Sequence, residues 1–574
     1  MEVHVHEAGR ELAAQPSLGQ RHPVLLMLAL AGVAALAVVV PFFFLGNASG
    51  HDFEFHLASW MDVAQQWHEG TLYPHWAALA NWGYGEPRFI FYPPISWLLG
   101  AGLSLLFPWS MIPGAFIWLA LTLAGVAMFM LAREWLPARD AQFAGVLFAL
   151  NPYHLVIVYW RSDFAELLAS ALVPLAVLYT LRTATAPRRA LLPLALVIAA
   201  IWLSNAPAAV VVTYTIVLSL VLLAARERSF RPLIYGAGAL ALGLAMAAFY
   251  IVPAAFEQSW VNISEVLSSG LTFPENFLFT HTADVEHTRF NFIVSWAAVA
   301  VIVATIGALF ASRRLRSKSP RLWLLLRVLT GVSILLMLPV TSPIWKHAPE
   351  LRYLQFPWRW LLALDVPFAF CLAAAAAGKL RAAGRYAAWA AALVGLAIAG
   401  FLLTRSNWWD AGGAADFYED HFRSGAGYFG VDEYAPRGVD HYDLDQNAPL
   451  VSLTPKPGTQ LELQAWRPAR KRFLVRSPEP VTATLRLLNY PAWRVEVNGK
   501  PVRALSREHT GEMLVPLPAG SSLVEVSFIA TPDRRWGEAV SAIAVLGLLA
   551  GAVASRRQRA AATKLGYANL SSAG

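Results

Sequence analysis

Long apolar runs, separated by short polar loops, fill most of this 574-residue chain. A helix needs about 20 mostly apolar residues to cross the hydrocarbon core of a bilayer. Thirteen runs reach or approach that length and predict a polytopic α-helical membrane protein of about 12–14 transmembrane helices. They lie at 24–45, 92–107, 112–131, 141–160, 164–181, 190–205, 208–224, 233–252, 291–311, 321–340, 357–377, 386–404 and 537–554.

The basic loops orient this pattern. Because Lys and Arg favour the cytoplasmic side of a membrane protein, the clusters between apolar runs place the long polar segments outside. The clearest clusters are Arg188-Arg189, Arg226 to Arg228, Arg313 to Arg321, Lys379 to Arg385 and Arg556 to Arg559.

The predicted organisation follows from this orientation. A cytoplasmic tail (1–23) precedes a transmembrane domain (24–404). The segment 24–45 lacks a convincing signal cleavage site, so we expect a retained helix. The domain's outer loops are 46–91 and 253–290, and a last helix (537–554) leads to a second cytoplasmic tail, 555–574.

Thirteen full crossings would leave the basic C-terminal tail outside, against the orientation rule. One segment must therefore be broken, re-entrant or split. Two candidates stay open: 92–107, bracketed by prolines, and 141–160, interrupted by Asn151-Pro152.

The outer segment 405–535 changes character along its length. Residues 405–460 are acidic and rich in Gly and Tyr, whereas 461–535 alternate apolar and polar positions, with Asn498-Gly499 as a hairpin signal. This pattern predicts an acidic linker followed by a small extracytoplasmic β-sandwich, anchored by the last helix.

Composition removes several function classes. With 57% hydrophobic and 14% charged residues, the chain has too little polar surface for a soluble body of its size. The net charge of +8 comes from the orienting loops, so we expect no nucleic-acid binding. A single cysteine, Cys371, allows neither a disulfide framework nor a cysteine metal site.

Candidate chemistry starts in the first outer loop. Asp52 and Glu54 lie two positions apart, flanked by His51 and His56, just after the first apolar run. Such a group can bind a divalent cation or take a proton from a hydroxyl. The alternative is a solvated helix exit without a role. Residues 57–67 have helical spacing and predict a helix along the membrane interface.

Several arginines fall at predicted outer helix ends, where the planar guanidinium suits phosphate oxygens. Arg359, which follows Pro357-Trp358, and then Arg161 are the favoured phosphate contacts, with Asp163 or Glu166 as the expected partner of Arg161. For any one arginine, snorkelling or a surface ion pair is the competing explanation. The full set is Arg88, Arg161, Arg289, Arg352 and Arg359.

The second outer loop contains potential metal ligands at regular spacing. His281, Asp284 and His287 recur at three-residue steps, with Glu286 beside them, and with His56 they are candidate metal or acceptor contacts. A solvated loop is the competing interpretation. The metal requirement stays open, with Mg or Mn as the candidate cations.

Charges within the apolar runs are costly, so they are expected to be functional or paired. Three residues fall in this class: Glu166, Arg327 and Asp365.

Several motifs together resemble one known family. The chain is similar to bacterial membrane proteins with a "6-pyruvoyl-tetrahydropterin synthase-related domain", which in turn resemble GT-C glycosyltransferases. Its C-terminal β module is similar to that of YfhO-type membrane proteins. The motifs are Gly50 to His56, Gly85-Glu86-Pro87, Phe91 to Pro94, Asn151-Pro152-Tyr153, Phe249 to Ala254, Gln355 to Arg359, Tyr490 to Trp493 and Val497 to Lys500.

The resemblance implies a GT-C-like core in a bacterial inner membrane, a polyprenyl-phosphate-sugar donor at the outer face and an acid of the first outer loop as catalytic base. By position that base is Asp52, with Glu54 as second acid or metal ligand. The expected activity is sugar transfer to an envelope glycan, lipid or protein. The rival hypotheses are a lipid-linked glycan transporter or flippase and a non-catalytic envelope-assembly protein.

Overall fold

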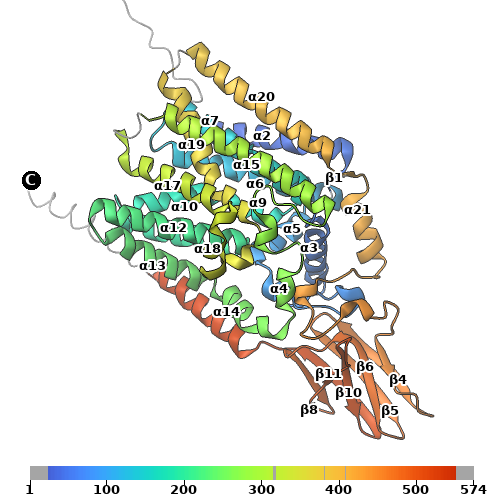
Figure 1. Cartoon of the computed structure of the whole chain (residues 1–574). Coiled ribbons are helices and arrows are strands. Elements are labelled where there is room, and N and C mark those ends of the chain that lie inside the picture. Colours follow the sequence, from blue (N-terminus) through green and yellow to red (C-terminus); the bar gives the residue numbers. More distant parts are fainter. Residues whose placement is uncertain (1–22, 49, 314–317, 380–381, 408, 551–574) are drawn as a thin grey trace, which may run out of the picture.

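The computed structural model describes residues 23–550 except 49, 314–317, 380–381 and 408. Helices form a large bundle, and β-sheets built from the C-terminal part of the chain lie at one end of it (Figure 1). The predicted polytopic helical protein with C-terminal β structure is confirmed. Both predicted tails, 1–23 apart from Pro23 and 555–574, lie outside the described residues.

Eight helical segments of the described chain are long and apolar enough to cross a membrane. Two further pairs of helices pass the same test only together, since each is sharply bent: α13 (Arg231–Met246) with α14 (Ala248–Glu257) by 73°, and α17 (Pro320–Leu336) with α18 (Ser342–His347) by 88°. The eight segments are Pro23–Leu45, Trp109–Ala132, Ala138–Arg161, Phe164–Arg182, Ala206–Glu227, Val285–Ala311, Pro357–Ala377 and Ala383–Arg405.

Two predicted crossings form helices shorter than a full span. The run 92–107 forms only the ten-residue α5 (Pro94–Leu103), about 15 Å long and half of a hydrocarbon core. The run 190–205 forms α11 (Pro187–Trp202), whose 16 residues include two arginines in the first turn. The last helix is described over 532–550.

The short α5 bears on which of the thirteen predicted segments does not cross the membrane. A helix of its length cannot cross alone, whereas the other candidate, 141–160, belongs to one apolar segment, Ala138–Arg161. That segment contains α7 (Ala138–Ala149), α8 (Pro152–Val156) and a π-turn over Ile157–Arg161. We therefore favour 92–107 as the segment that does not cross.

Other helices complete the bundle. They are α2 (Pro23–Leu45), α6 (Ile112–Ala132), α9 (Phe164–Ser170), α10 (Val173–Arg182), α12 (Ala206–Glu227), α15 (Val285–Ala311), α19 (Leu361–Lys379) and α20 (Ala382–Ser406). Helix α3 (Phe53–His68) confirms the predicted helix in the first loop and buries the apolar face around Leu57, Trp60 and Met61.

The β region consists of two antiparallel sheets. One has the order β3-β6-β10-β9 and the other β4-β5-β11-β7-β8. Asn498 and Gly499 both have positive φ, 52° and 74°, and join β7 to β8 as the sequence predicts. The strands are β3 (Val451–Leu453), β4 (Gln460–Arg467), β5 (Arg470–Ser477), β6 (Val481–Leu488), β7 (Trp493–Val497), β8 (Lys500–Val502), β9 (Leu505–Ser506), β10 (Glu512–Leu517) and β11 (Gly520–Phe528).

The sheets are joined to the bundle by a buried ionic contact. Glu257, at the end of α14, accepts hydrogen bonds from Tyr490 (2.5 Å) and from two guanidinium nitrogens of Arg534 (2.7 and 2.9 Å). Trp76 and Tyr84 of the first loop pack into the same apolar cluster as the strands. The first loop therefore lies between the sheets and the helices.

Candidate functional site

The candidate site forms where two apolar segments meet. Ala138–Arg161 ends at a left-handed residue, Ser162 (φ 53°), and the next helix, α9, starts after Asp163. The Asp163 side chain caps α9 by accepting from the amide of Glu166 at 2.9 Å. This tight reversal brings Arg161, Asp163 and Glu166 together within six residues of sequence.

Arg161 is the centre of a buried ionic cluster. Its guanidinium contacts carboxylate oxygens of Glu166 (2.7 Å), Asp52 (2.9 Å) and Asp163 (3.2 Å). The predicted pairing of Arg161 with Asp163 or Glu166 is therefore confirmed for both. A guanidinium carries five N–H donors in a planar fork, so one arginine can hold three carboxylates in fixed positions.

Arg359 joins this cluster from the segment before α19. Its Nε lies 3.0 Å from Glu166 Oε2, and its Nη1 donates to the Leu354 carbonyl at 2.7 Å. The ring of Phe356 stacks under both Arg161 and Arg359. Glu166, fully buried, also accepts from the Tyr153 hydroxyl. The costly intramembrane Glu166 is thus paired, as its position predicts.

The first outer loop docks directly onto the reversal. The amide of Asp52 donates to the Arg161 carbonyl at 2.9 Å, and the amide of Gly50 donates to Ser162 Oγ at 3.1 Å. A Cβ on Gly50 would stand 2.5 Å from the Arg161 carbonyl carbon. Only glycine permits this close approach, which fixes the backbone of Asp52 against the cluster.

Asp52 differs from the other carboxylates in its exposure. Its side chain is 36% exposed, whereas those of Asp163 and Glu166 are 5% and 0% exposed. One oxygen of Asp52 is held by Arg161, and no partner of the other oxygen occurs among the described residues. Asp52 is therefore the place where this cluster meets the solvent.

The pKa of Asp163 reflects the charges that surround it in the cluster. Burial alone would raise the pKa of this carboxyl, but the Arg161 guanidinium, followed by the nearby His56 and Arg359, holds it well below its usual range. His56 Nε2 lies 3.7 Å from Asp163 Oδ1. His56 is therefore a neighbour of this cluster rather than of Glu54.

Aromatic rings line the approach from the first loop. Tyr92 lies 4.6 Å from Phe55 and 5.8 Å from His56 between ring centroids. Burial, followed by the nearby charges of Asp163 and Asp52, raises the pKa of Tyr92 well above its ordinary value. The Tyr92 phenol therefore keeps its proton and remains a hydrogen-bond donor beside the carboxylates.

Other predicted site residues lie apart from this cluster. Glu54 is exposed in the first turn of α3 and has no side-chain partner in the described chain. Arg88 is buried, bonded to Glu86 at 2.7 Å, and stacked on Phe55. Arg352 is exposed and bonds the neighbouring Tyr353 at 2.6 Å.

The second outer loop places its polar residues around the start of α15. Asp284 caps this helix by accepting from the amides of Glu286 and His287. His287 bonds Asn276 at 2.8 Å, and His281 packs against Phe292. Within the described residues, no group of three His, Cys, Asp or Glu side chains is arranged to hold a metal ion.

One family description matches the chain. The family of membrane proteins described as "6-pyruvoyl-tetrahydropterin synthase related domain" matches residues 89–408, more than half of the chain. The chain belongs to this family. The match includes Arg161, Glu166 and Arg359 but begins after Asp52. No curated protein matches this chain.

Two solved structures are similar to this family member. One is the arabinofuranosyltransferase AftD from Mycobacteria, at 18% identity and a TM-score of 0.40, covering 66% of this chain and 26% of that one. The other is the apo oligosaccharyltransferase of Archaeoglobus fulgidus, at 14% identity and a TM-score of 0.38, covering 68% and 56%. The family member spans less than two thirds of either structure.

One exposed cation, Arg289, lies close to the segment that carries Arg161. Arg289, 48% exposed, lies with its guanidinium 5.6 Å from the centre of the Trp160 ring, next to Arg161 in sequence. His51 packs on Phe290 at 4.9 Å and lies within electrostatic reach of Asp52 and His287. Sequence position alone does not favour Arg289 over the other arginines; its contact with Trp160 distinguishes it from them.

Two further charges of the apolar runs have no partner in the described chain. Both carboxylate oxygens of Asp365 are buried without a hydrogen bond. Arg327, in contrast, is exposed on α17, where a long side chain can reach the membrane surface. Neither residue belongs to the Asp52 cluster.

Proposed function

We propose that this chain is a membrane glycosyltransferase that moves a sugar from a polyprenyl-phosphate carrier to an envelope glycan, lipid or protein. The observation that carries the proposal is Asp52, a partly exposed carboxylate fixed by the buried Arg161 at the end of a membrane-spanning segment. The sequence motifs shared with GT-C-like proteins support the same role. On this proposal, Asp52 faces the outer side of a bacterial inner membrane.

Asp52 would act as the general base. In an inverting transfer, the acceptor hydroxyl gives its proton to Asp52 while its oxygen forms a bond to the anomeric carbon. The bond from that carbon to the phosphate oxygen breaks, and its electron pair leaves with the polyprenyl phosphate. A carboxylate held at one oxygen and open at the other suits this step, because it has a fixed orientation and a free acceptor.

The charge of the buried cluster supports this assignment. Apart from His56, two arginines face three carboxylates, which leaves one net negative charge. A proton taken up by Asp52 would bring the cluster to neutrality without moving a buried group. Arg161 then serves mainly as a positioning residue for Asp52.

The same contacts change which residues are the best candidates to bind the donor phosphate. Arg161, Arg359 and Arg88 are engaged by buried carboxylates, so each would have to break an ion pair to bind phosphate. We assign the phosphate contact to Arg289 and His287 instead, both at the start of α15. The carboxylate that Arg289 meets among the described residues is Glu286, an exposed side chain at 3.5 Å, so this contact is weaker than the buried pairs. Arginine at an exposed site can bind two phosphate oxygens through its planar fork.

A matched pair of variants tests the base. Purified chain in nanodiscs is supplied with a panel of synthetic polyprenyl-phosphate pentoses and hexoses, together with envelope extract as acceptor, and released polyprenyl phosphate is measured. We expect Asp52→Asn to lower the rate by roughly 10²–10⁴-fold. Glu54→Gln, two residues away and without a partner, serves as control and should change the rate less than tenfold. Full activity of Asp52→Asn, with wild-type melting behaviour, would remove the role assigned to Asp52.

Cysteine labelling tests the sidedness. The only native cysteine, Cys371, is buried, so Asp52→Cys can be labelled in an otherwise unreactive chain. An impermeant maleimide added to intact cells should label position 52. Labelling only after the cells are permeabilised would contradict an outer location.

A further inference from the structure

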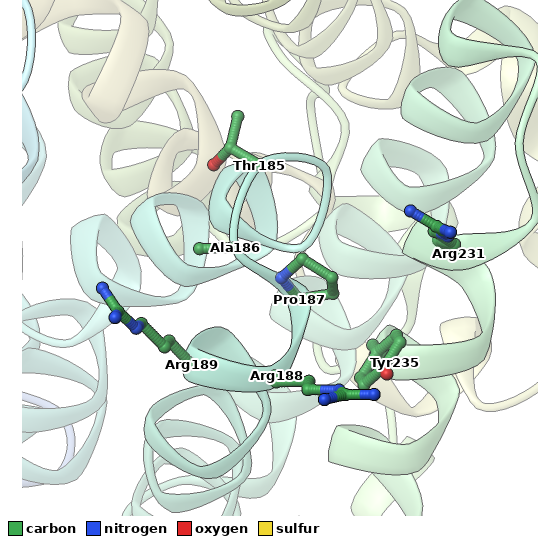
Figure 2. Close-up of a pocket in the computed structure, with 7 residues that line it drawn as sticks. All are labelled: Thr185, Ala186, Pro187, Arg188, Arg189, Arg231 and Tyr235. Carbon is green, nitrogen blue, oxygen red and sulfur yellow. The ribbon is translucent and has the colours of Figure 1, made fainter. Parts of the chain in front are cut away.

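A charged pocket lies between the α10–α11 turn and the start of α13. Its volume is about 530 Å³, within the range of roughly 300–1,000 Å³ typical of small-molecule sites. Figure 2 shows Arg188 and Arg189 at the start of α11 and Arg231 with Tyr235 on the facing helix. Thr185, Ala186 and Pro187 complete the lining.

The three arginines of this pocket carry uncompensated charge. None of them has a carboxylate partner among the described residues, and no acidic residue lines the pocket. Two other arginines at the same end of the helices are paired: Arg182 lies 2.6 Å from Glu134, and Arg321 lies 2.6 Å from Glu227. The pocket is therefore a local concentration of positive charge.

The backbone and two hydroxyls add to this preference for an anion. Helices α11 and α13 both begin at the pocket, and each is 16 residues long, so the positive ends of two helix dipoles meet there. The hydroxyls of Thr185 and Tyr235 have no hydrogen-bond partner in the described chain. Guanidinium and hydroxyl donors together match the oxygens of a phosphate group.

The pocket lies at the opposite end of the bundle from Asp52. The segment Phe164–Arg182 begins beside Arg161 and ends just before Thr185, so a full helical span separates the two places. We propose that this pocket is a binding site for a phosphate ester, either an anionic lipid headgroup or a soluble phosphate compound. The site is independent of the glycosyl transfer proposed above.

Native mass spectrometry of the full chain tests the site. The protein, released from nanodiscs of phosphatidylcholine with increasing phosphatidylglycerol, is measured for bound lipid. A second arm adds inorganic phosphate or glycerol 3-phosphate as a competitor. A direct contact between a guanidinium and the phosphate group is worth roughly fivefold in affinity, and only arginines that line the pocket can make it. Replacing all three pocket arginines with Gln should therefore weaken phosphatidylglycerol binding on the order of 100-fold.

A charge-matched triple variant provides the control. Arg139→Gln, Arg226→Gln and Arg228→Gln remove the same charge from exposed positions at the same end of the helices, outside the pocket lining. This control should lose less than fivefold. If the pocket triple variant does not fold, the single variants Arg188→Gln and Arg231→Gln should each lose roughly fivefold.

The outcomes divide clearly. Selective loss in the pocket variants supports the site, and displacement by soluble phosphate identifies a soluble ligand rather than a lipid. Equal loss in the pocket and control variants would reduce the effect to general surface charge and overturn the proposal. Absence of any phosphate ligand on the wild-type chain would overturn it as well.

Discussion

The ion pair between Arg359 and Glu166 gives the sharpest test of the buried cluster. Arg359 Nε lies 3.0 Å from Glu166 Oε2, and the two side chains are only 4% and 0% exposed. Removal of one partner from such a pair leaves an uncompensated buried charge and costs about 3–5 kcal/mol. We therefore expect Arg359→Gln to lower the free energy of unfolding by about 3–5 kcal/mol.

A double-mutant cycle isolates the interaction. In Arg359→Gln the cluster would carry two net negative charges instead of one, and adding Glu166→Gln would restore the original balance. The double variant should therefore lose less stability than the sum of the two single variants. The expected difference is about 1.5 kcal/mol or more.

The assay is denaturant unfolding of the purified full chain in mixed micelles, followed by tryptophan fluorescence. The partly exposed pair of Arg321 and Glu227, at 2.6 Å, serves as a control cycle, and its coupling should be only about 0.2–1 kcal/mol. Additive losses within about 0.5 kcal/mol for Arg359 and Glu166 would show that the pair is not energetically coupled. That result would refute the charge-balance reasoning.

Three further predictions follow from other contacts. A Cβ on Gly50 would stand 2.5 Å from the Arg161 carbonyl carbon, so Gly50→Ala should lower the melting temperature and slow transfer. A Cβ on Gly102 would have no atom within 4 Å, so Gly102→Ala should change neither the melting temperature nor the transfer rate. Burial, together with the charges of nearby acids, raises the pKa of Glu433 to about 7 from 4.5. The folded state then binds more protons than the unfolded state between these values, so stability should fall as pH rises through this window. Glu433→Gln should flatten that slope in thermal unfolding at several pH values. Arg534→Gln should leave Glu257 buried without its cation; limited proteolysis should then cleave the β region at protease concentrations that spare the wild type.

Much of the architecture was readable from local pattern. Apolar length predicts the spans, because a bilayer requires it, and Asn498-Gly499 predicts its hairpin, because both residues accept positive φ. The pairing of Arg161 was also predictable, since Asp163 and Glu166 are close in sequence and a buried charge needs a partner.

The remaining features depend on contacts between distant segments. The bends of 73° and 88° interrupt apolar runs that have no polar signal strong enough to locate them. Arg88 and Arg359 occupy similar positions at predicted helix ends, but only the structure shows Arg88 bonded to Glu86 and Arg359 bonded to Glu166, 193 positions away. Spacing alone also could not separate Asp52 from Glu54.

The difference between these two acids comes from the backbone rather than from their chemistry. Gly50 lets the loop approach Ser162, and the Asp52 amide then bonds the Arg161 carbonyl, so the side chain of Asp52 is carried to the guanidinium. Two residues later the chain is already helical, and Glu54 is exposed on α3. An exposed carboxylate free to rotate loses orientation on binding a substrate, whereas one held by a buried arginine has already paid that cost in folding. The fixed position of Asp52 is thus the physical reason to place the proton acceptor there and not at Glu54.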